Sequence, residues 1–126
     1  MEKARSTVEQ VLAAARRVHE ALGHRLSDEA YEGALAEELA QGGLAVERGR
    51  PLVLRGDGCA LDFGLVADLL VEGRVVVRLG SLAARDAGFE RLLLGRLALP
   101  GARAAVFLDF SRKVLDVLAL APVEAA

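Results

Sequence analysis

Several residue types that mark specialised proteins are scarce or missing in this chain. Its one cysteine, Cys59, fits a reducing compartment and excludes an internal disulfide or a cysteine-rich zinc site. No apolar run approaches the roughly 18 to 20 uninterrupted residues that a membrane-spanning helix needs. The first residues, MEKARSTVEQ, lack the apolar core of a signal peptide. We therefore expect a cytoplasmic protein that does not cross a membrane.

The chain also lacks a surplus of charge of either sign. It has 16 basic and 18 acidic residues, a net charge of −2, which gives no strong field for attracting polyanions. A basic patch that binds nucleic acid without cutting it stays open as an alternative, and it would use Arg16, Arg17, Arg85, Arg91, Arg96 and Arg103. Isoleucine, asparagine and tryptophan are absent, and scarce Asn, Gln, Cys and Met would suit a thermophile.

What the sequence does contain is a regular alternation of helical and extended patterns. At 126 residues it has the length of one domain, residues 1–126, with a core expected over about 6–120. Apolar residues at helical spacing predict a helix over 6–22, with Ser6 and Glu9 as a capping box and Gly23 as its end. A second helix is predicted from Ser27 to about Gln41, and a third over 83–99.

The extended segments surround one hairpin. Residues 65–80 read as two strands joined by a Glu72-Gly73 turn, because β-branched and aliphatic residues suit strands and glycine tolerates positive φ. Short extended pieces over 44–61 suggest an outer hairpin before it, and residues 104–110 and 114–120 read as two later strands. The expected order is α-α-β(β)-ββ-α-β-β, which predicts an α/β (α+β) fold with a mixed central sheet flanked by helices.

Two polar residues lie in apolar surroundings. Asp68 interrupts an apolar strand, and a carboxylate there is costly to desolvate unless it pairs with a cation, binds a metal or reaches water at a strand end. His19 lies one residue off the apolar stripe of the first predicted helix. Since no other His or Cys stands at ligand spacing, we interpret it as a boundary histidine bonded to a carbonyl oxygen.

A family resemblance follows from two motifs, VHEALGHRLSDEAYEGAL at 18–35 and VADLLVEGRVVVRLG at 66–80. They resemble the GxxExxY family of small bacterial proteins, a branch of the PD-(D/E)XK nuclease-like superfamily. The resemblance implies a restriction-endonuclease-like core. It also implies a site built from an acid on one strand of the hairpin, an acid-x-lysine triplet on the next strand and an assisting acid from an early helix. Such a site holds Mg²⁺, which activates water.

The residues at these positions depart from the family pattern. Asp68 stands at the first acid and Asp28 at the early-helix acid, but Arg78 replaces the second acid and Gly80 the lysine. On the later helix, only Glu90 remains of a His-Glu-x-Gln pattern. An Arg in place of an acid changes the local charge by two units, and each unit charge at about 4 Å is worth roughly 4 kcal/mol at an effective dielectric of 20. We expect Arg78 to pair with Asp68 directly or through one water.

These departures favour a catalytically inactive nuclease-fold protein that acts as a binding or assembly module, with no cofactor. The alternative is a metal-dependent nuclease in which Asp28, Asp68 and either Glu90 or Asp62 hold Mg²⁺. The apolar stripe of the predicted helix 83–99 is wider than the roughly 100° that one packing surface requires. That excess predicts a homodimer through this helix.

Overall fold

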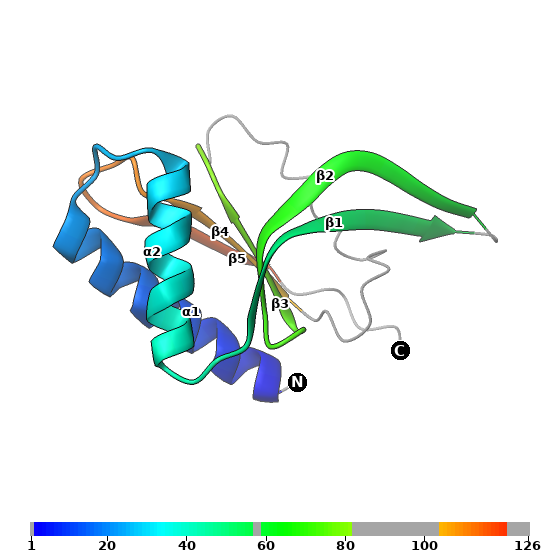
Figure 1. The fold of residues 1–126 in the computed structure, drawn as a ribbon, viewed down its shortest axis with the longest axis horizontal. Helices are drawn as coiled ribbons and strands as arrows, with labels where there is room; N and C mark the ends of the chain where they lie inside the picture. Colours follow the sequence, from blue (N-terminus) through cyan, green and yellow to red (C-terminus); the bar gives the residue numbers. More distant parts are fainter. Residues whose placement is uncertain (1, 57–58, 82–103, 121–126) are drawn as a thin grey trace.

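The computed structural model describes residues 2–56, 59–81 and 104–120 (Figure 1). Two helices, α1 (Glu2–Leu22) and α2 (Asp28–Gln41), come first in the chain. Five strands follow, β1 (Val46–Gly56), β2 (Cys59–Val71), β3 (Val75–Leu79), β4 (Ala104–Asp109) and β5 (Asp116–Leu120). The predicted third helix, 83–99, lies outside the described residues.

The two helices form where the sequence predicted them, with one difference at the start of α1. That helix begins at Glu2, so the Ser6–Glu9 pair lies inside it and the predicted capping box is wrong. Its end is as predicted, because Gly23 takes φ 77° and its amide donates to the carbonyl of His19. The second start is confirmed as well. The Ser27 hydroxyl accepts from the Ala30 amide at 3.2 Å, satisfying one of the free donors of the first turn.

The five described strands form one mixed sheet in the order β1-β2-β3-β4-β5. All neighbours are antiparallel except β3 and β4, which run parallel, with Val77 opposite Val106. Parallel neighbours need a crossover of about a dozen residues or more, a length that residues 80–103 supply. The sheet and the two helices confirm the expected α+β class with its mixed central sheet.

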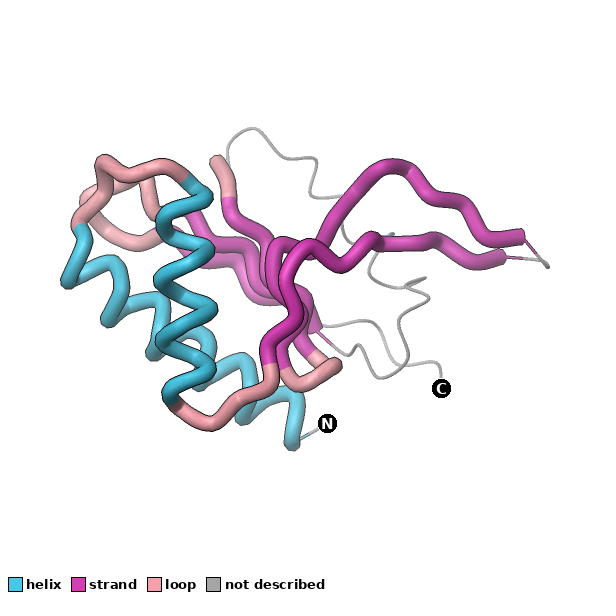
Figure 2. Tube along the Cα trace, viewed as in Figure 1, coloured by secondary structure: helices cyan, strands magenta, loops and turns pink. Residues whose placement is uncertain are grey.

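The hairpins differ from the prediction in their lengths. The short pieces expected over 44–61 are two long strands, and β2 continues from Cys59 into the strand that carries Asp68. Main-chain pairing tolerates the Gly and Pro residues of β1, and its register shifts by a bulge between Pro51 and Val53. Figure 2 shows that this β1–β2 ribbon extends away from the helices. The predicted tight turn is confirmed, with Glu72 at φ 55° and Gly73 at φ 64°.

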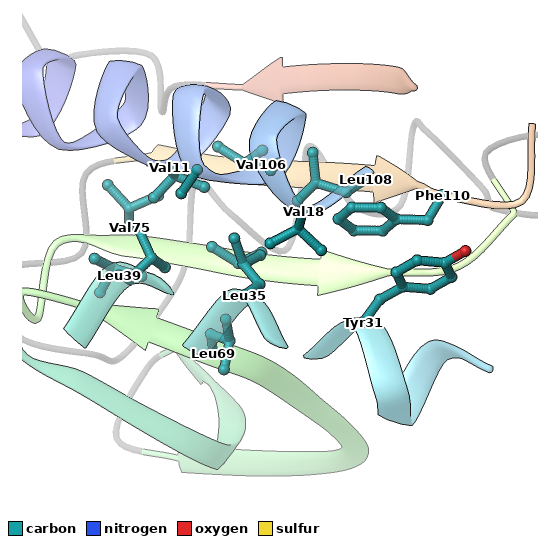
Figure 3. Close-up of a cluster of buried hydrophobic side chains, with 14 of the residues drawn as sticks. Val11, Val18, Tyr31, Leu35, Leu39, Leu69, Val75, Val106, Leu108 and Phe110 are labelled. Atoms are coloured by element: carbon teal, nitrogen blue, oxygen red, sulfur yellow. The ribbon is translucent and has the colours of Figure 1, made fainter. Parts of the chain in front are cut away.

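The core lies between the two helices and one face of the sheet (Figure 3). Leu35 and Leu39 of α2 and Val11 of α1 are almost fully buried there against the sheet. Strand residues that face the helices alternate with residues on the other face, since successive side chains point to opposite sides of a sheet. The helix-facing set is Leu69, Val71, Val75, Val77, Ala104, Val106, Leu108 and Phe110. Asp68 and Arg78 therefore belong to the face turned away from the helices.

Candidate functional site

The site implied by the family pattern lies where β2 and β3 separate. Their pairing ends with Leu69 opposite Val77, and in this register Asp68 stands opposite Arg78. Opposite residues of an antiparallel pair lie on the same face, so both side chains start from the same side of the sheet. Both residues are half-buried. The structure thus brings together three of the predicted positions: Asp68, Arg78 and Gly80.

The carboxylate of Asp68 has a main-chain partner. Its Oδ2 accepts a hydrogen bond from the amide of Leu79 at 2.7 Å, a length typical of a charge-assisted bond. A contact of this carboxylate with Arg78, direct or through one water, stays a prediction. The Leu79 amide is thus one partner of the carboxylate. The three alternatives drawn from the sequence, which were a cation, a metal and water, did not include it.

The geometry of this bond follows from how the sheet opens. Amides along β3 point alternately towards β2 and β4, and the Gly80 amide donates to the carbonyl of Leu108 in β4 at 3.0 Å. The Leu79 amide therefore points towards β2. Because the described pairing of β2 with β3 has already ended at Leu69, the Asp68 side chain takes the place of a main-chain acceptor. The acid closes the end of the strand pair.

Gly80, which stands at the lysine position of the resembled pattern, has an unusual backbone conformation. Its φ is +150°, a region that side-chain-bearing residues rarely adopt, although a Cβ would meet nothing within 4 Å. Space is therefore available for a side chain, but the backbone disfavours one. Both the residue type and its backbone conformation are thus unfavourable for a lysine at this position.

The fit of a divalent cation to these positions is poor. Mg²⁺ prefers carboxylate and other oxygen ligands, whereas Arg78 offers a guanidinium that has donors only. One oxygen of Asp68 is already committed to the Leu79 amide. Within residues 2–56, 59–81 and 104–120, no three His, Cys, Asp or Glu side chains gather closely enough to hold a metal. Glu90 and the side chain of Asp62 fall outside this description.

Asp28, the early-helix acid, occupies the first turn of α2 and is exposed. An acid there is favourable because the amide dipoles of a helix make its N-terminus partly positive. No described contact joins it to Asp68 or Arg78. The structure therefore places Asp28 where the sequence predicted, at a helix start, and gives it a structural explanation.

An aromatic cluster holds the start of α2 against the end of β4. The ring of Tyr31 stacks on Phe110 with centroids 4.5 Å apart and planes 8° from parallel (Figure 3). The Tyr31 hydroxyl donates to the carbonyl of Gly23 at 2.6 Å and accepts from the amide of Leu26 at 3.2 Å. A single side chain thus fixes the α1–α2 loop, a role that sequence reasoning missed although the tyrosine was part of the matched motif.

The prediction for His19 is confirmed. Its Nε2 lies 2.8 Å from the carbonyl oxygen of Arg112, and its ring contacts Phe110 with centroids 6.1 Å apart. The histidine therefore binds the loop between β4 and β5 to the last turn of α1. Its role is to hold two parts of the chain together, as expected of a boundary histidine.

Asp109 is a buried acid that the sequence analysis did not single out. It is 5% exposed at the end of β4, and its Oδ1 accepts from the amide of Ser111 at 3.0 Å and from the Ser111 hydroxyl at 2.5 Å. An acid two residues before a serine at a strand end is a common turn pattern and could have suggested this arrangement. The bonds stabilise the turn into the β4–β5 loop.

Comparison with known proteins agrees with the class of fold that these features indicate. The family model described as "PD-(D/E)XK nuclease superfamily" matches residues 5–118. The chain belongs to that superfamily. Neither the curated proteins nor the solved structures compared with it gave a match. Narrower membership in the GxxExxY family stays a prediction. Among the described residues, no helix is both long and apolar enough for a membrane crossing.

Proposed function

We propose that this domain is a catalytically inactive member of the PD-(D/E)XK superfamily that acts as a binding or assembly module. The observation that carries the proposal is which residues stand at the triplet Arg78-Leu79-Gly80, at the end of β3. Arg78 stands where the family pattern has an acid, and Gly80 replaces the lysine in a conformation that disfavours a side chain. The remaining acid, Asp68, bonds to the main chain of β3.

A nuclease assay tests this proposal directly. The purified protein is incubated with Mg²⁺ or Mn²⁺ and with single- and double-stranded DNA and RNA, and the products are resolved on denaturing gels. We expect no cleavage above that of an Asp68→Ala control prepared in parallel. Metal-dependent cleavage that the control lacks would overturn the proposal. It would favour a nuclease with relocated ligands, in which Asp28 and Asp68 act with Glu90 or Asp62.

Binding of nucleic acid without cleavage is a separate outcome. Retention on immobilised DNA that falls steeply with salt would indicate a phosphate-binding surface, because bound cations are released when basic side chains contact phosphates. The net charge of −2 disfavours that outcome. Retention that does not change with salt or with DNA concentration would leave the binding module without a nucleic-acid role.

The homodimer is proposed from the sequence, since its helix 83–99 lies outside the described residues. Its support is the width of the apolar stripe, which exceeds what one packing surface requires. Light scattering during size-exclusion chromatography at micromolar concentration should report twice the chain mass of 13.3 kDa. A monomer under those conditions removes the proposed dimer.

A further inference from the structure

We propose that the loops at the start of α2 and at the end of β4 form a docking surface for an acidic, amphipathic segment of a partner protein. This inference rests on the proposed binding function and names the surface that would perform it. Three exposed aliphatic residues, Leu22, Leu26 and Val114, make up the apolar tip. Three exposed basic residues, Arg25, Arg112 and Lys113, make up the basic rim.

The apolar tip gathers an unusual set of residues. Leu22 is 42% exposed, Leu26 47% and Val114 80%, and these are the large hydrophobic residues that stand out as exposed in the described chain. Single exposed aliphatic residues are normal on a protein surface, but here they fall on two loops that lie together. Their grouping is therefore the observation that needs an explanation.

Three contacts hold the two loops together. His19 binds the carbonyl of Arg112, and Leu22 lies one helical turn beyond His19. Tyr31 binds the amide of Leu26, and its ring stacks on Phe110 just before the β4–β5 loop. Figure 1 shows the loop after α1 beside the loop between β4 and β5. The surface is built on buried aromatic contacts, so it is ordered before any partner binds, which lowers the entropic cost of binding.

The charges on these loops indicate the chemistry of the partner. Residues 22–27 and 110–115 carry three basic side chains and no acid. The nearest acids in sequence that are exposed are Glu20 on α1 and the pair in the first turn of α2, where the helix dipole already favours negative charge. Basic groups around an aliphatic centre complement a segment with aliphatic anchors and acidic flanks, because opposite charges steer the encounter and fix the register.

Other occupants fit this surface less well. Single-stranded nucleic acid binds largely by stacking on exposed aromatic rings, whereas Tyr31 and Phe110 are each 1% exposed. A membrane-binding element usually presents a long apolar helix face, and here the aliphatic residues are few and lie on loops. An amphipathic peptide needs only a few anchors at helical spacing to bind a protein surface.

A peptide selection tests the inference with the full chain. A displayed library of random peptides is selected on the wild-type protein, with counter-selection on the Val114→Asp variant. We expect the enriched peptides to combine aliphatic with acidic residues. Measured by fluorescence anisotropy, their affinity should fall about tenfold or more in Val114→Asp and in Arg112→Glu, as is typical of central anchors and close charge pairs.

Matched variants control for folding and for charge. Ala40→Asp adds an acid at the exposed far end of α2, and Arg16→Glu reverses an exposed charge on α1. Both should bind as the wild type does. Because the backbone carbonyl of Arg112, rather than its side chain, contacts His19, Arg112→Glu keeps the loop contact. Melting curves of all variants verify that each is folded.

Several outcomes would overturn the inference. Enriched peptides that are basic, or that bind Val114→Asp as tightly as the wild type, would contradict the docking surface, and so would a failure to enrich any peptide. Sedimentation with phosphatidylserine vesicles that Val114→Asp abolishes would identify a membrane instead. A wild-type dimer that Val114→Asp converts to a monomer would identify a second copy. None of these results requires nuclease activity, so the inference can fail while the proposed inactivity holds, and the reverse.

Discussion

Replacing Asp68 with alanine tests whether its carboxylate has a structural or a metal-binding role. The two roles predict opposite changes in the free energy of unfolding. Asp68→Ala removes the acceptor of the Leu79 amide, whose bond is 2.7 Å long in a half-buried setting. A hydrogen bond to a charged group is worth about 1.5–3 kcal/mol, and an unsatisfied amide adds its own cost. We therefore expect the free energy of unfolding to fall by about 1–3 kcal/mol.

The assay is urea denaturation followed by circular dichroism, with thermal melting as a second measure. At this chain length each kcal/mol corresponds to a melting temperature change of roughly 3–6 °C. Asp68→Asn keeps an acceptor oxygen without the charge and should lose about half as much, because charge-assisted bonds are about twice as strong as neutral ones. The matched control is Asp28→Ala, which removes an exposed first-turn acid and should cost at most about 1 kcal/mol.

The opposite result would refute this reasoning. When no metal is bound, the acids of a metal site repel one another or lack a partner. Removing one of them therefore tends to leave the free energy of unfolding unchanged or to raise it. An Asp68→Ala protein as stable as the wild type would show that the bond to Leu79 contributes little. Mg²⁺ could also raise the melting temperature of the wild type but not that of Asp68→Ala. That result would indicate that the carboxylate binds a metal.

Three further predictions concern the other residues of the fold and site. The double variant Arg78→Glu, Gly80→Lys should show no nuclease activity. Its free energy of unfolding should be about 1–3 kcal/mol lower than that of Arg78→Glu alone, because φ +150° at position 80 strains a residue that carries a side chain. Equal urea midpoints of the two variants would contradict this. Tyr31→Phe should lower the free energy of unfolding by about 1–2 kcal/mol through loss of two hydrogen bonds while keeping the ring contact; unchanged calorimetric stability would speak against it. Glu72→Ala should lower the free energy of unfolding by about 1–2 kcal/mol, because the Oε2 of Glu72 accepts a hydrogen bond from the Ala45 amide at 2.6 Å. Chemical denaturation should show whether Glu72→Gln recovers most of that loss.

The local features of the fold were predictable because their causes are local. Ser27 caps α2 and Gly23 ends α1 through contacts made within a few residues, and the 72–73 turn depends on its own backbone angles. The false capping box at Ser6 shows the limit of such reasoning. A serine followed by a glutamate three residues on marks a helix start only if the preceding residues are not helical, and here residues 2–5 continue the helix.

The parts that were missed depend on where strands stop pairing. Two extended pieces joined into β2 because main-chain pairing with β1 continued through residues that usually interrupt strands. Likewise, Asp68 bonds to the Leu79 amide because the described pairing of β2 with β3 ends at Leu69. No residue type in the sequence marks that position as the end of the pairing. Sequence placed Asp68 opposite Arg78 correctly. It could not tell that the amide of Leu79, the residue after Arg78, would reach the carboxylate.

An acid at position 68 has a structural explanation in this fold. In the absence of a metal, a half-buried carboxylate such as that of Asp68 needs another partner to offset its desolvation cost. Its bond to Leu79 instead closes the strand pair at the point where β2 and β3 separate. An acid at this position is thus compatible with inactivity, and its presence alone is weak evidence for catalysis. The residues that would discriminate are Arg78 on β3 and Gly80 directly after it, which stand where the resembled family pattern has an acid and a lysine.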